Sequence, residues 1–189
     1  MIESLKQLDR DIFVYLNGLG MEKYDGLWVF VTQVSNWIPL VILFFILIFH
    51  FYKRKQALTV IVYLLVVVAL TVSITAIVKD WVARPRPGEV EAFRGLIRVL
   101  QEPSRHSFFS GHASYSFAIT TYVVLSLKSY TKWIYFSFLW PILFVMSRIY
   151  VGVHYPSDII VGALVGATIA FAGYKQSQAF LRKSSVRNS

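Results

Sequence analysis

Long uninterrupted apolar blocks constrain this chain more than any other feature of its sequence. Residues 57–78 contain no charged side chain, and residues 156–174 contain only Asp158, near their start. A helix needs about 20 apolar residues to cross the hydrocarbon core of a bilayer, and both blocks are close to that length. Hydrophobic residues make up 56% of the chain and the mean hydropathy is +0.57, which is unusual for a soluble domain. We therefore expect an integral membrane protein.

Five apolar segments are expected to cross the bilayer as helices, within a single domain of residues 1–189. The expected fold class is all-α, an integral membrane helical bundle. Asn36, Trp37 and Pro39 interrupt the first segment, so its beginning is ambiguous. The expected transmembrane segments are 27–51, 57–78, 110–127, 133–150 and 156–174.

The segment 1–20 has apolar residues at helical spacing and polar residues largely off that stripe. This pattern predicts an N-terminal amphipathic helix that lies in the membrane interface. A short helix packed on the bundle explains the pattern equally well, and both interpretations stay open. The apolar stripe consists of Leu5, Leu8, Ile12 and Leu16.

The net charge of +9 does not indicate a nucleic-acid partner, because the basic residues flank apolar spans, as they do in membrane proteins generally. The segment 175–189 is polar and basic, and we expect it to be a frayed cytoplasmic tail. The absence of cysteine excludes disulfides and thiolate metal sites.

Five alternating spans put the turn at 53–55, the turn at 128–132 and the tail on one side, with no acidic residue among them. The numbers of Lys and Arg on the two sides are nearly equal, so the positive-inside rule alone decides nothing. If the arginines of loop 82–109 are retained for anion binding and set aside, the basic turns lie in the cytoplasm. That loop and His154 then face outward.

The same alternation brings polar residues from three parts of the chain to one membrane face. They follow the second span, open the third span, and lie between the fourth and fifth spans. Charged groups at membrane helices are costly, so we take a functional role as the first interpretation. These residues are Lys79, Arg84, Arg86, Ser110, Gly111, His112, Arg148, His154 and Asp158.

One lysine and three arginines in this set predict an anion site, because a guanidinium matches the oxygens of a phosphate. Ser110 and Gly111 lie where a helix begins, and free backbone N–H groups there also favour a phosphate. The four cations are Lys79, Arg84, Arg86 and Arg148.

The two histidines indicate covalent phosphoryl transfer. His154 would attack phosphorus, and Asp158 would hold its ring in the correct tautomer. His112 would protonate the leaving oxygen and later activate water. We expect no metal and no cofactor, because the lysine and arginines can supply the positive charge.

Three motifs in this region resemble those of the type 2 phosphatidic acid phosphatase family, in its membrane-bound branch. The family pattern is Lys, six residues, Arg-Pro; then Pro-Ser-Gly-His; then Ser-Arg, five residues, His, three residues, Asp. Phe109 stands where the family usually has proline, which affects the turn rather than a phosphate ligand. This chain has Lys79, six residues and Arg86-Pro87, then Ser110-Gly111-His112, then Ser147-Arg148, five residues, His154, three residues and Asp158.

The resemblance implies that His154 is the nucleophile, Asp158 its partner and His112 the general acid. It implies a metal-independent lipid phosphatase, multi-pass in a bacterial plasma (inner) membrane, with its active site on the outer or periplasmic side. Undecaprenyl diphosphate is the favoured substrate; phosphatidylglycerol phosphate, phosphatidate and lipid A phosphates are alternatives. The implied phosphate ligands are Lys79, Arg86, Ser110, Gly111 and Arg148.

Other functions stay open at this point. A lipid phosphotransferase could use the same site, with a lipid acceptor in place of water. A non-catalytic phospholipid-binding membrane protein would keep the cations but would not need both histidines and the aspartate. Five apolar spans argue against the soluble haloperoxidases of the same family. The oligomeric state and the roles of four loop residues are not predicted: Arg94, Arg98, Arg105 and His106.

Overall fold

The structure is a computed structural model that describes residues 2–102 and 106–186. The described residues form α-helices and short 3-10 helices, with no strand among them, which confirms the predicted all-α class. The α-helices are α1 (Ile2–Gly18), α2 (Asp25–Thr32), α3 (Ile38–Phe51), α4 (Arg54–Val82), α5 (Gly111–Leu127), α6 (Leu139–Tyr150) and α7 (Pro156–Val186). The 3-10 helices are η1 (Glu22–Tyr24), η2 (Val34–Trp37), η3 (Pro87–Glu89), η4 (Glu91–Phe93) and η5 (Lys132–Phe138).

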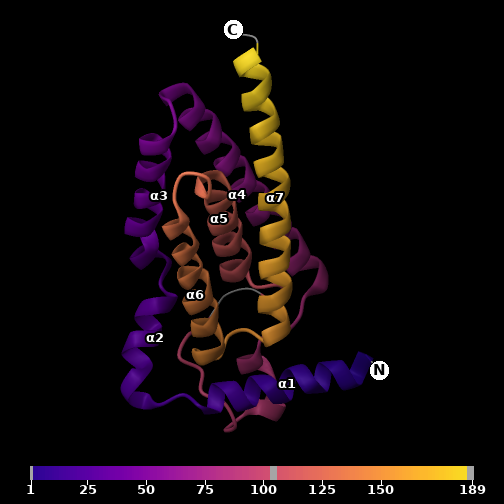
Figure 1. The fold of residues 1–189 in the computed structure, drawn as a ribbon. Coiled ribbons are helices and arrows are strands. Elements are labelled where there is room, and N and C mark those ends of the chain that lie inside the picture. The colour runs from indigo at the N-terminus through magenta and orange to yellow at the C-terminus, as the bar shows by residue number, and fades with distance from the viewer. Residues whose placement is uncertain (1, 103–105, 187–189) are drawn as a thin grey trace.

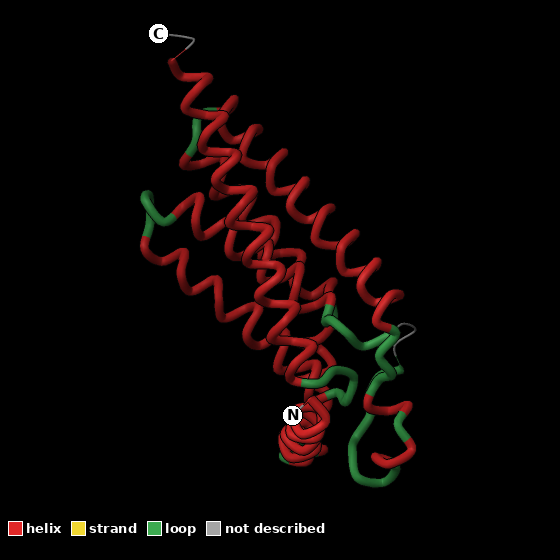
Figure 2. The backbone as a smooth tube through the Cα atoms, turned by 90° about the vertical axis from the view of Figure 1, so that its right-hand side faces the viewer, coloured by secondary structure: helices red, strands yellow, loops and turns green. Residues whose placement is uncertain are grey.

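Helices α3 to α7 run side by side as a bundle, and α1 lies across one end of it (Figure 1). The connection from α4 to α5 lies at the same end, and the C-terminus of α7 lies at the opposite end (Figure 2). Helix α5 packs against α4, α6 and α7 and is buried along most of its length. The polar loops that carry the motifs therefore gather at one end of the bundle, beside α1.

Within residues 2–102 and 106–186, four helical stretches are long and apolar enough to cross a membrane. Helix α5, which was expected as a further span, has 17 residues and falls below that length. The total of five spans therefore remains a prediction. The four stretches are Val34–Phe51, Arg54–Phe93, Lys132–Tyr150 and Pro156–Ser184.

The expected first span, 27–51, is not one continuous helix. It divides into α2 and α3 at Gln33, whose backbone is extended. Two side chains stabilise the break by donating to carbonyls at the end of α2. Asn36 Nδ2 bonds to the Phe30 carbonyl at 2.8 Å, and Trp37 Nε1 bonds to the Val31 carbonyl at 2.8 Å. These two residues were flagged as interruptions, and they define a helix boundary.

The expected frayed tail, 175–189, is helical as far as Val186, because α7 continues past the predicted end of its span. Residues 187–189 lie outside the described part of the chain. The extension packs on the N-terminal part of α4. Ser177 is fully buried and donates to the Tyr174 carbonyl, and the rings of Phe180 and Tyr63 lie 6.3 Å apart. Side chains that pack on α4 therefore stabilise this segment as a helix, although its sequence is polar and basic.

Helix α1 has two side-chain stripes, one that packs on the bundle and one that is exposed. The stripe of Asp9, Phe13 and Asn17, at spacings of four residues, faces the bundle, and Phe13 and Asn17 are fully buried. The predicted apolar stripe faces away from it, with Leu5 at 62% and Leu8 at 54% exposure. The two interpretations of this segment are therefore compatible, since the helix packs on the bundle and still presents an apolar surface.

Candidate active site

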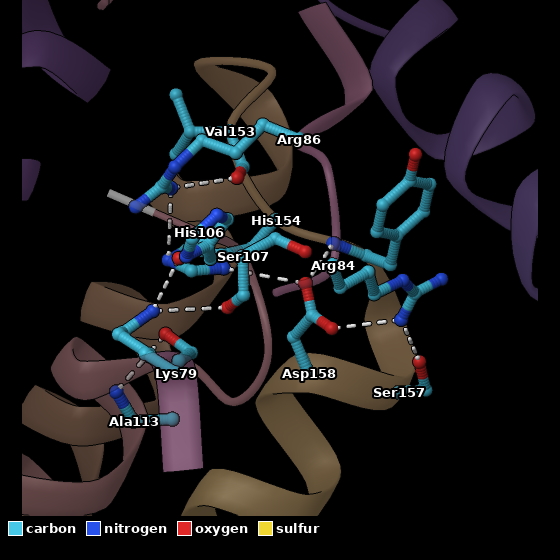
Figure 3. A network of polar contacts seen from close by, with 12 residues as sticks. Lys79, Arg84, Arg86, His106, Ser107, Ala113, Val153, His154, Ser157 and Asp158 are labelled. Atoms are coloured by element: carbon cyan, nitrogen blue, oxygen red, sulfur yellow. Dashed lines mark hydrogen bonds and ion pairs between the residues drawn. The ribbon is translucent and has the colours of Figure 1, made fainter. Parts of the chain in front are cut away.

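The three sequence motifs meet at the end of the bundle that α1 covers (Figure 3). Lys79 comes from the last turns of α4, His154 from the α6–α7 loop, and Asp158 from the first turn of α7. The backbone N–H of Ser110 donates to the carbonyl of Asp158 at 2.9 Å, which ties the second motif to the third. All four residues are buried, with at most 8% of their surface exposed.

His154 and Asp158 form a buried pair. His154 Nδ1 lies 3.3 Å from Asp158 Oδ2, and the same oxygen accepts the backbone N–H of Tyr155 at 3.0 Å. An ionised carboxylate beside Nδ1 keeps the ring proton on that nitrogen. The lone pair is then on Nε2, which points away from Asp158.

Arg86 faces that second ring nitrogen. Its Nη1 atom lies 3.3 Å from His154 Nε2 and donates to the Val153 carbonyl at 2.9 Å. The backbone N–H of Arg86 donates to Glu89 Oε2 at 2.8 Å and so fixes the start of η3. A phosphate bound to this guanidinium lies next to the histidine lone pair.

Burial holds the pKa of His154 well below its usual range, and the positive charges of Arg86, Arg148 and Lys79 lower it further. Burial disfavours the charged imidazolium, and the cations repel it. The imidazole is therefore neutral at physiological pH, which is the form that a nitrogen nucleophile requires.

Lys79 is held by the loop that precedes α5. Its Nζ donates to the carbonyls of His106, at 2.7 Å, and Ser107, at 3.1 Å. Each carbonyl oxygen accepts from the ammonium group of Lys79, and a phosphate oxygen could accept from the same N–H donors. The loop thus lies over the cation that the first motif contributes.

Arg148, near the end of α6, is held from two other directions. Its Nη1 donates to the hydroxyl of Thr32 and to Gln101 Oε1, the latter at 2.9 Å. The Nε atom of Arg148 is buried, without a hydrogen-bond partner among the described residues. A buried guanidinium with an unused donor is a ready partner for an anion.

Ser110 caps α5 by accepting the N–H of Ala113 at 3.4 Å, as expected for a helix that begins at Gly111. The first N–H groups of a helix have no intrahelical acceptor and favour an anion. A Cβ added to Gly111 would contact Thr75 at an ordinary 3.7 Å. Protein packing therefore does not require glycine here, whereas close approach of a ligand to the backbone does.

His112 stands in the first turn of α5 against two aromatic rings. Its ring centroid lies 4.8 Å from that of Phe144 and 5.6 Å from that of Tyr115. The charge of Arg148 acts on it electrostatically. The second histidine therefore belongs to the same constellation.

Arg84 departs from its expected place in the anion-binding cluster. Its Nη1 donates to Asp158 Oδ1 and to Ser157 Oγ, each at 2.8 Å, and its Nη2 donates to Asp9 Oδ2 at 2.7 Å. Two carboxylates already neutralise this guanidinium. Its contacts support Asp158 rather than a phosphate.

The loop arginines with unassigned roles divide into three cases. Arg94 pairs with Glu91 at 2.9 Å, and both side chains are more than four-fifths exposed. Arg98 pairs with Asp25 at 2.5 Å, across the gap between the loop and the start of α2. Arg105 lies outside the described residues. Neither described arginine contacts the site.

Sequence analysis missed three residues that the structure connects to the site. Asp9 binds Arg84, and Thr32 and Gln101 bind Arg148. They come from α1, from α2 and from the part of the long loop that follows Arg86-Pro87, all outside the three motifs. The spacing of Asp9 with Phe13 and Asn17 was a signal for a second face of α1, but it did not indicate a partner.

A cavity of about 410 Å³ adjoins the site through Arg86 and Val153. Glu89, Gln101 and Glu102 make much of its wall polar. No cluster of three or more His, Asp or Glu side chains suited to a metal ion occurs within residues 2–102 and 106–186. The cavity, whose wall combines these polar groups with Val99 and Val153, can take the part of a substrate that surrounds its phosphate.

Known proteins are similar to this chain in sequence. A family model described as the PAP2 superfamily matches residues 60–182. A lipid A 4'-phosphatase from Porphyromonas gingivalis is 30% identical over 183 residues, which cover 92% of this chain and 75% of that protein. An undecaprenyl-diphosphatase from Sulfolobus acidocaldarius is 29% identical over 166 residues, which cover 85% of this chain and 74% of that protein.

The fold also has a solved counterpart. The crystal structure of a transmembrane PAP2-type phosphatidylglycerolphosphate phosphatase from Bacillus subtilis superposes with a TM-score of 0.72. The identity is 20%, and the match covers 95% of this chain and 87% of that one. The family match spans more than half of the chain and includes all three motifs. The chain therefore belongs to the PAP2 superfamily, and it is a multi-pass membrane phosphatase that hydrolyses phosphoric esters.

Proposed function

We propose that this protein removes phosphate from a membrane lipid through a phosphohistidine at His154, without a metal ion. The observation that carries the proposal is the position of His154 between Asp158 and Arg86. One ring nitrogen is held by a carboxylate at 3.3 Å, and the other faces a guanidinium at 3.3 Å. An anion bound to that guanidinium would lie next to the nucleophilic lone pair.

In the first step, Nε2 of His154 forms a bond to phosphorus while the bond from phosphorus to the leaving oxygen breaks. His112 gives a proton to that oxygen, and Asp158 stabilises the charged ring. In the second step, water bonds to phosphorus and gives a proton to His112, and the P–N bond breaks. Inorganic phosphate leaves and both histidines return to their starting forms.

Charge on the transferring group would be stabilised by side chains and by the start of α5. In-line phosphoryl transfer depends mainly on such positioning and electrostatic stabilisation. Lysine and arginine supply the positive charge that a metal supplies in other phosphatases. The proposed phosphate ligands are Lys79, Arg86, Ser110, Gly111 and Arg148.

For the substrate, we place a phosphorylated glycolipid of the lipid A type first and undecaprenyl diphosphate second. Relatives of similar identity are named for each. The family resemblance alone favours the isoprenoid. The cavity beside Arg86 supports the glycolipid, because the carboxylates of Glu89 and Glu102 in its wall can accept hydrogen bonds from sugar hydroxyls but repel a second phosphate.

We further propose that the active site faces the outer or periplasmic side of a bacterial plasma (inner) membrane. The basic turns at 53–55 and 128–132 lie at the opposite end of the bundle from α1, and segments rich in Lys and Arg favour the cytoplasm. A phosphotransferase remains the second candidate function, because a lipid hydroxyl could replace water in the second step.

The test is phosphate release by the purified protein in detergent with a chelator present. The substrates are lipid A, undecaprenyl diphosphate, phosphatidylglycerol phosphate and phosphatidate, each with and without a phosphate-free acceptor lipid. We expect lipid A to lose phosphate fastest, with no dependence on divalent metal. Loss of activity in chelator, or intact lipids throughout, would contradict the proposal. Phosphate that reaches the acceptor lipid would establish the transferase.

A further inference from the structure

The carboxylate of Asp9 connects helix α1 to the candidate active site. Its Oδ2 accepts from Arg84 Nη2 at 2.7 Å and from Ser157 Oγ at 2.5 Å. Its Oδ1 accepts the backbone N–H of Ser157 at 2.9 Å. Only 12% of the Asp9 side chain is exposed, although its helix is otherwise largely exposed. An N-terminal segment is thus hydrogen-bonded to the residue that directly precedes Asp158.

Arg84 links the two carboxylates. One amino group of its guanidinium donates to Asp158 and the other donates to Asp9, so the planar fork is used on both sides. The guanidinium carbon also lies 3.8 Å from the ring centre of Tyr155, which restricts its plane. Lysine offers a single point charge and cannot reproduce this geometry.

The two carboxylate oxygens of Asp158 have different partners. Oδ1 binds Arg84 at 2.8 Å, while Oδ2 faces His154 Nδ1. A guanidinium that acted on Asp158 alone would neutralise the charge that His154 needs when its ring becomes positive. Asp9 shares the guanidinium, so the group of two carboxylates and one arginine keeps one net negative charge.

Asp9 also fixes the backbone that carries Asp158. The N–H of Ser157 is one of the free donors in the first turn of α7, and the carboxylate of Asp9 satisfies it. A negative charge at this end of a helix is favourable. The first turn of α7 is therefore held to α1 by charge and by direct hydrogen bonds.

We infer that Asp9 and Arg84 are positioning residues for the Asp158–His154 pair, so that the interfacial helix takes part in catalysis. The inference rests on the proposed nucleophilic role of His154. Neither residue touches the phosphate. Both act through Asp158, by setting its orientation and by leaving its charge free for the imidazole.

The test is a double-mutant cycle that combines Asp9→Asn with Asp158→Asn. Turnover of ³²P-labelled lipid by the detergent-purified protein gives kcat and KM for each variant. In the wild-type background, we expect D9N to lower kcat by about 10- to 100-fold with little change in KM, as for other partners that orient a catalytic group. In the D158N background, we expect D9N to change kcat less than about twofold, because residues that act as a unit are not additive.

Asp11→Asn is the matched control, since Asp11 is an exposed acid on the same helix and accepts a hydrogen bond from Gln7 at 2.8 Å. It should leave kcat unchanged. An equal fold loss from D9N in both backgrounds would indicate a merely structural role and would overturn the inference, as would no loss in either. Full activity of D158N itself would instead refute the proposed function, so the two failures are distinguishable.

A second measurement uses Arg84→Ala with added guanidinium. We expect R84A to lose activity and millimolar guanidinium to restore part of it, because the ion can reoccupy the site between the two carboxylates. Arg84→Lys should remain impaired. Full activity of R84K, or an R84A enzyme that stays equally inactive with and without guanidinium, would contradict the role assigned to Arg84.

Discussion

At the scale of single residues, Asp158 joins several parts of the site. It accepts from Arg84 through one oxygen and from the backbone of Tyr155 through the other, which also faces His154. A carboxylate with these partners is held in one rotamer. Its side chain is fully buried, so each contact acts in a low dielectric.

Asp158→Asn is therefore expected to remove activity while the protein stays folded. The amide keeps the size of the side chain but presents an N–H donor or a neutral oxygen to Nδ1, which favours the wrong tautomer of His154. The same change in a serine protease triad lowers kcat by about 10⁴-fold, and we expect a loss of at least about 10³-fold here. Steady-state kinetics measure the loss, and gel filtration checks the fold. Activity within tenfold of wild type would contradict the account.

The lowered pKa of His154 predicts a pH dependence of stability. The folded protein keeps this ring neutral, whereas the unfolded chain binds a proton below a pKa of about 6.5. The unfolded state then holds more protons, so stability falls as the pH drops through 6.5. Between pH 7 and pH 5, the melting temperature of wild type should fall more steeply than that of His154→Gln. Parallel curves would mean that His154 is not a buried neutral ring.

The motif residues were predictable from the sequence because their spacing and chain order are local properties. Their supporting partners were not, because those contacts join distant segments. Asp9 and Arg84 are separated by 75 positions, and Thr32 and Arg148 by 116. Arg84 was misjudged for the same reason, since its carboxylate neighbours become visible only in three dimensions.

At the scale of helices, the contact between α5 and α7 sets the site, because Ser110 opens one and Asp158 the other. A Cβ on Gly166 would lie 2.0 Å from the Ser114 carbonyl oxygen, and a Cβ on Gly162 would lie 2.6 Å from the Ser110 carbonyl oxygen. Glycine at these two positions therefore allows the two backbones to touch.

Gly166→Ala should destabilise the protein, because the added methyl group meets backbone rather than a mobile side chain. Overpacking of this kind costs about 1–3 kcal/mol, and we expect a lower melting temperature in detergent. Gly26→Ala is the control, since a Cβ there meets nothing within 4 Å. It should leave the melting temperature unchanged or slightly higher. Equal behaviour of the two variants would show that α5 and α7 are not in backbone contact.

Helix boundaries were only partly predictable. The hydropathy pattern found the apolar core of each helix, and Ser110 was correctly placed where α5 begins. The pattern missed the continuation of α7 to Val186, because that segment is basic and its stability comes from packing on α4. The boundary between α2 and α3 depends on side-chain caps that hydropathy does not register.

At the scale of the whole molecule, the fold separates two ends. One carries α1, the long loop and the candidate active site, and the other carries the basic turns and the end of α7 (Figures 1 and 2). Hydropathy and alternation predicted this separation, since each span reverses the direction of the chain. The proposed orientation of the two ends in the membrane is based on the distribution of Lys and Arg.

The chain has no cysteine, so single cysteines can report this topology directly. Arg94→Cys places a thiol at an exposed loop position, and Lys55→Cys places one in the first basic turn. We expect an impermeant maleimide added to intact cells to label position 94, and to label position 55 only after permeabilisation. The reverse pattern would place the active site in the cytoplasm.

The central claim is that His154 attacks phosphorus. The most direct test is phosphate release from the preferred lipid by wild type and His154→Ala, in chelator, with His50→Ala as an exposed histidine control. We predict that H154A loses turnover by at least about 10⁴-fold, as expected when a covalent nucleophile is removed, whereas H50A retains it. Turnover by folded H154A within tenfold of wild type would contradict the mechanism.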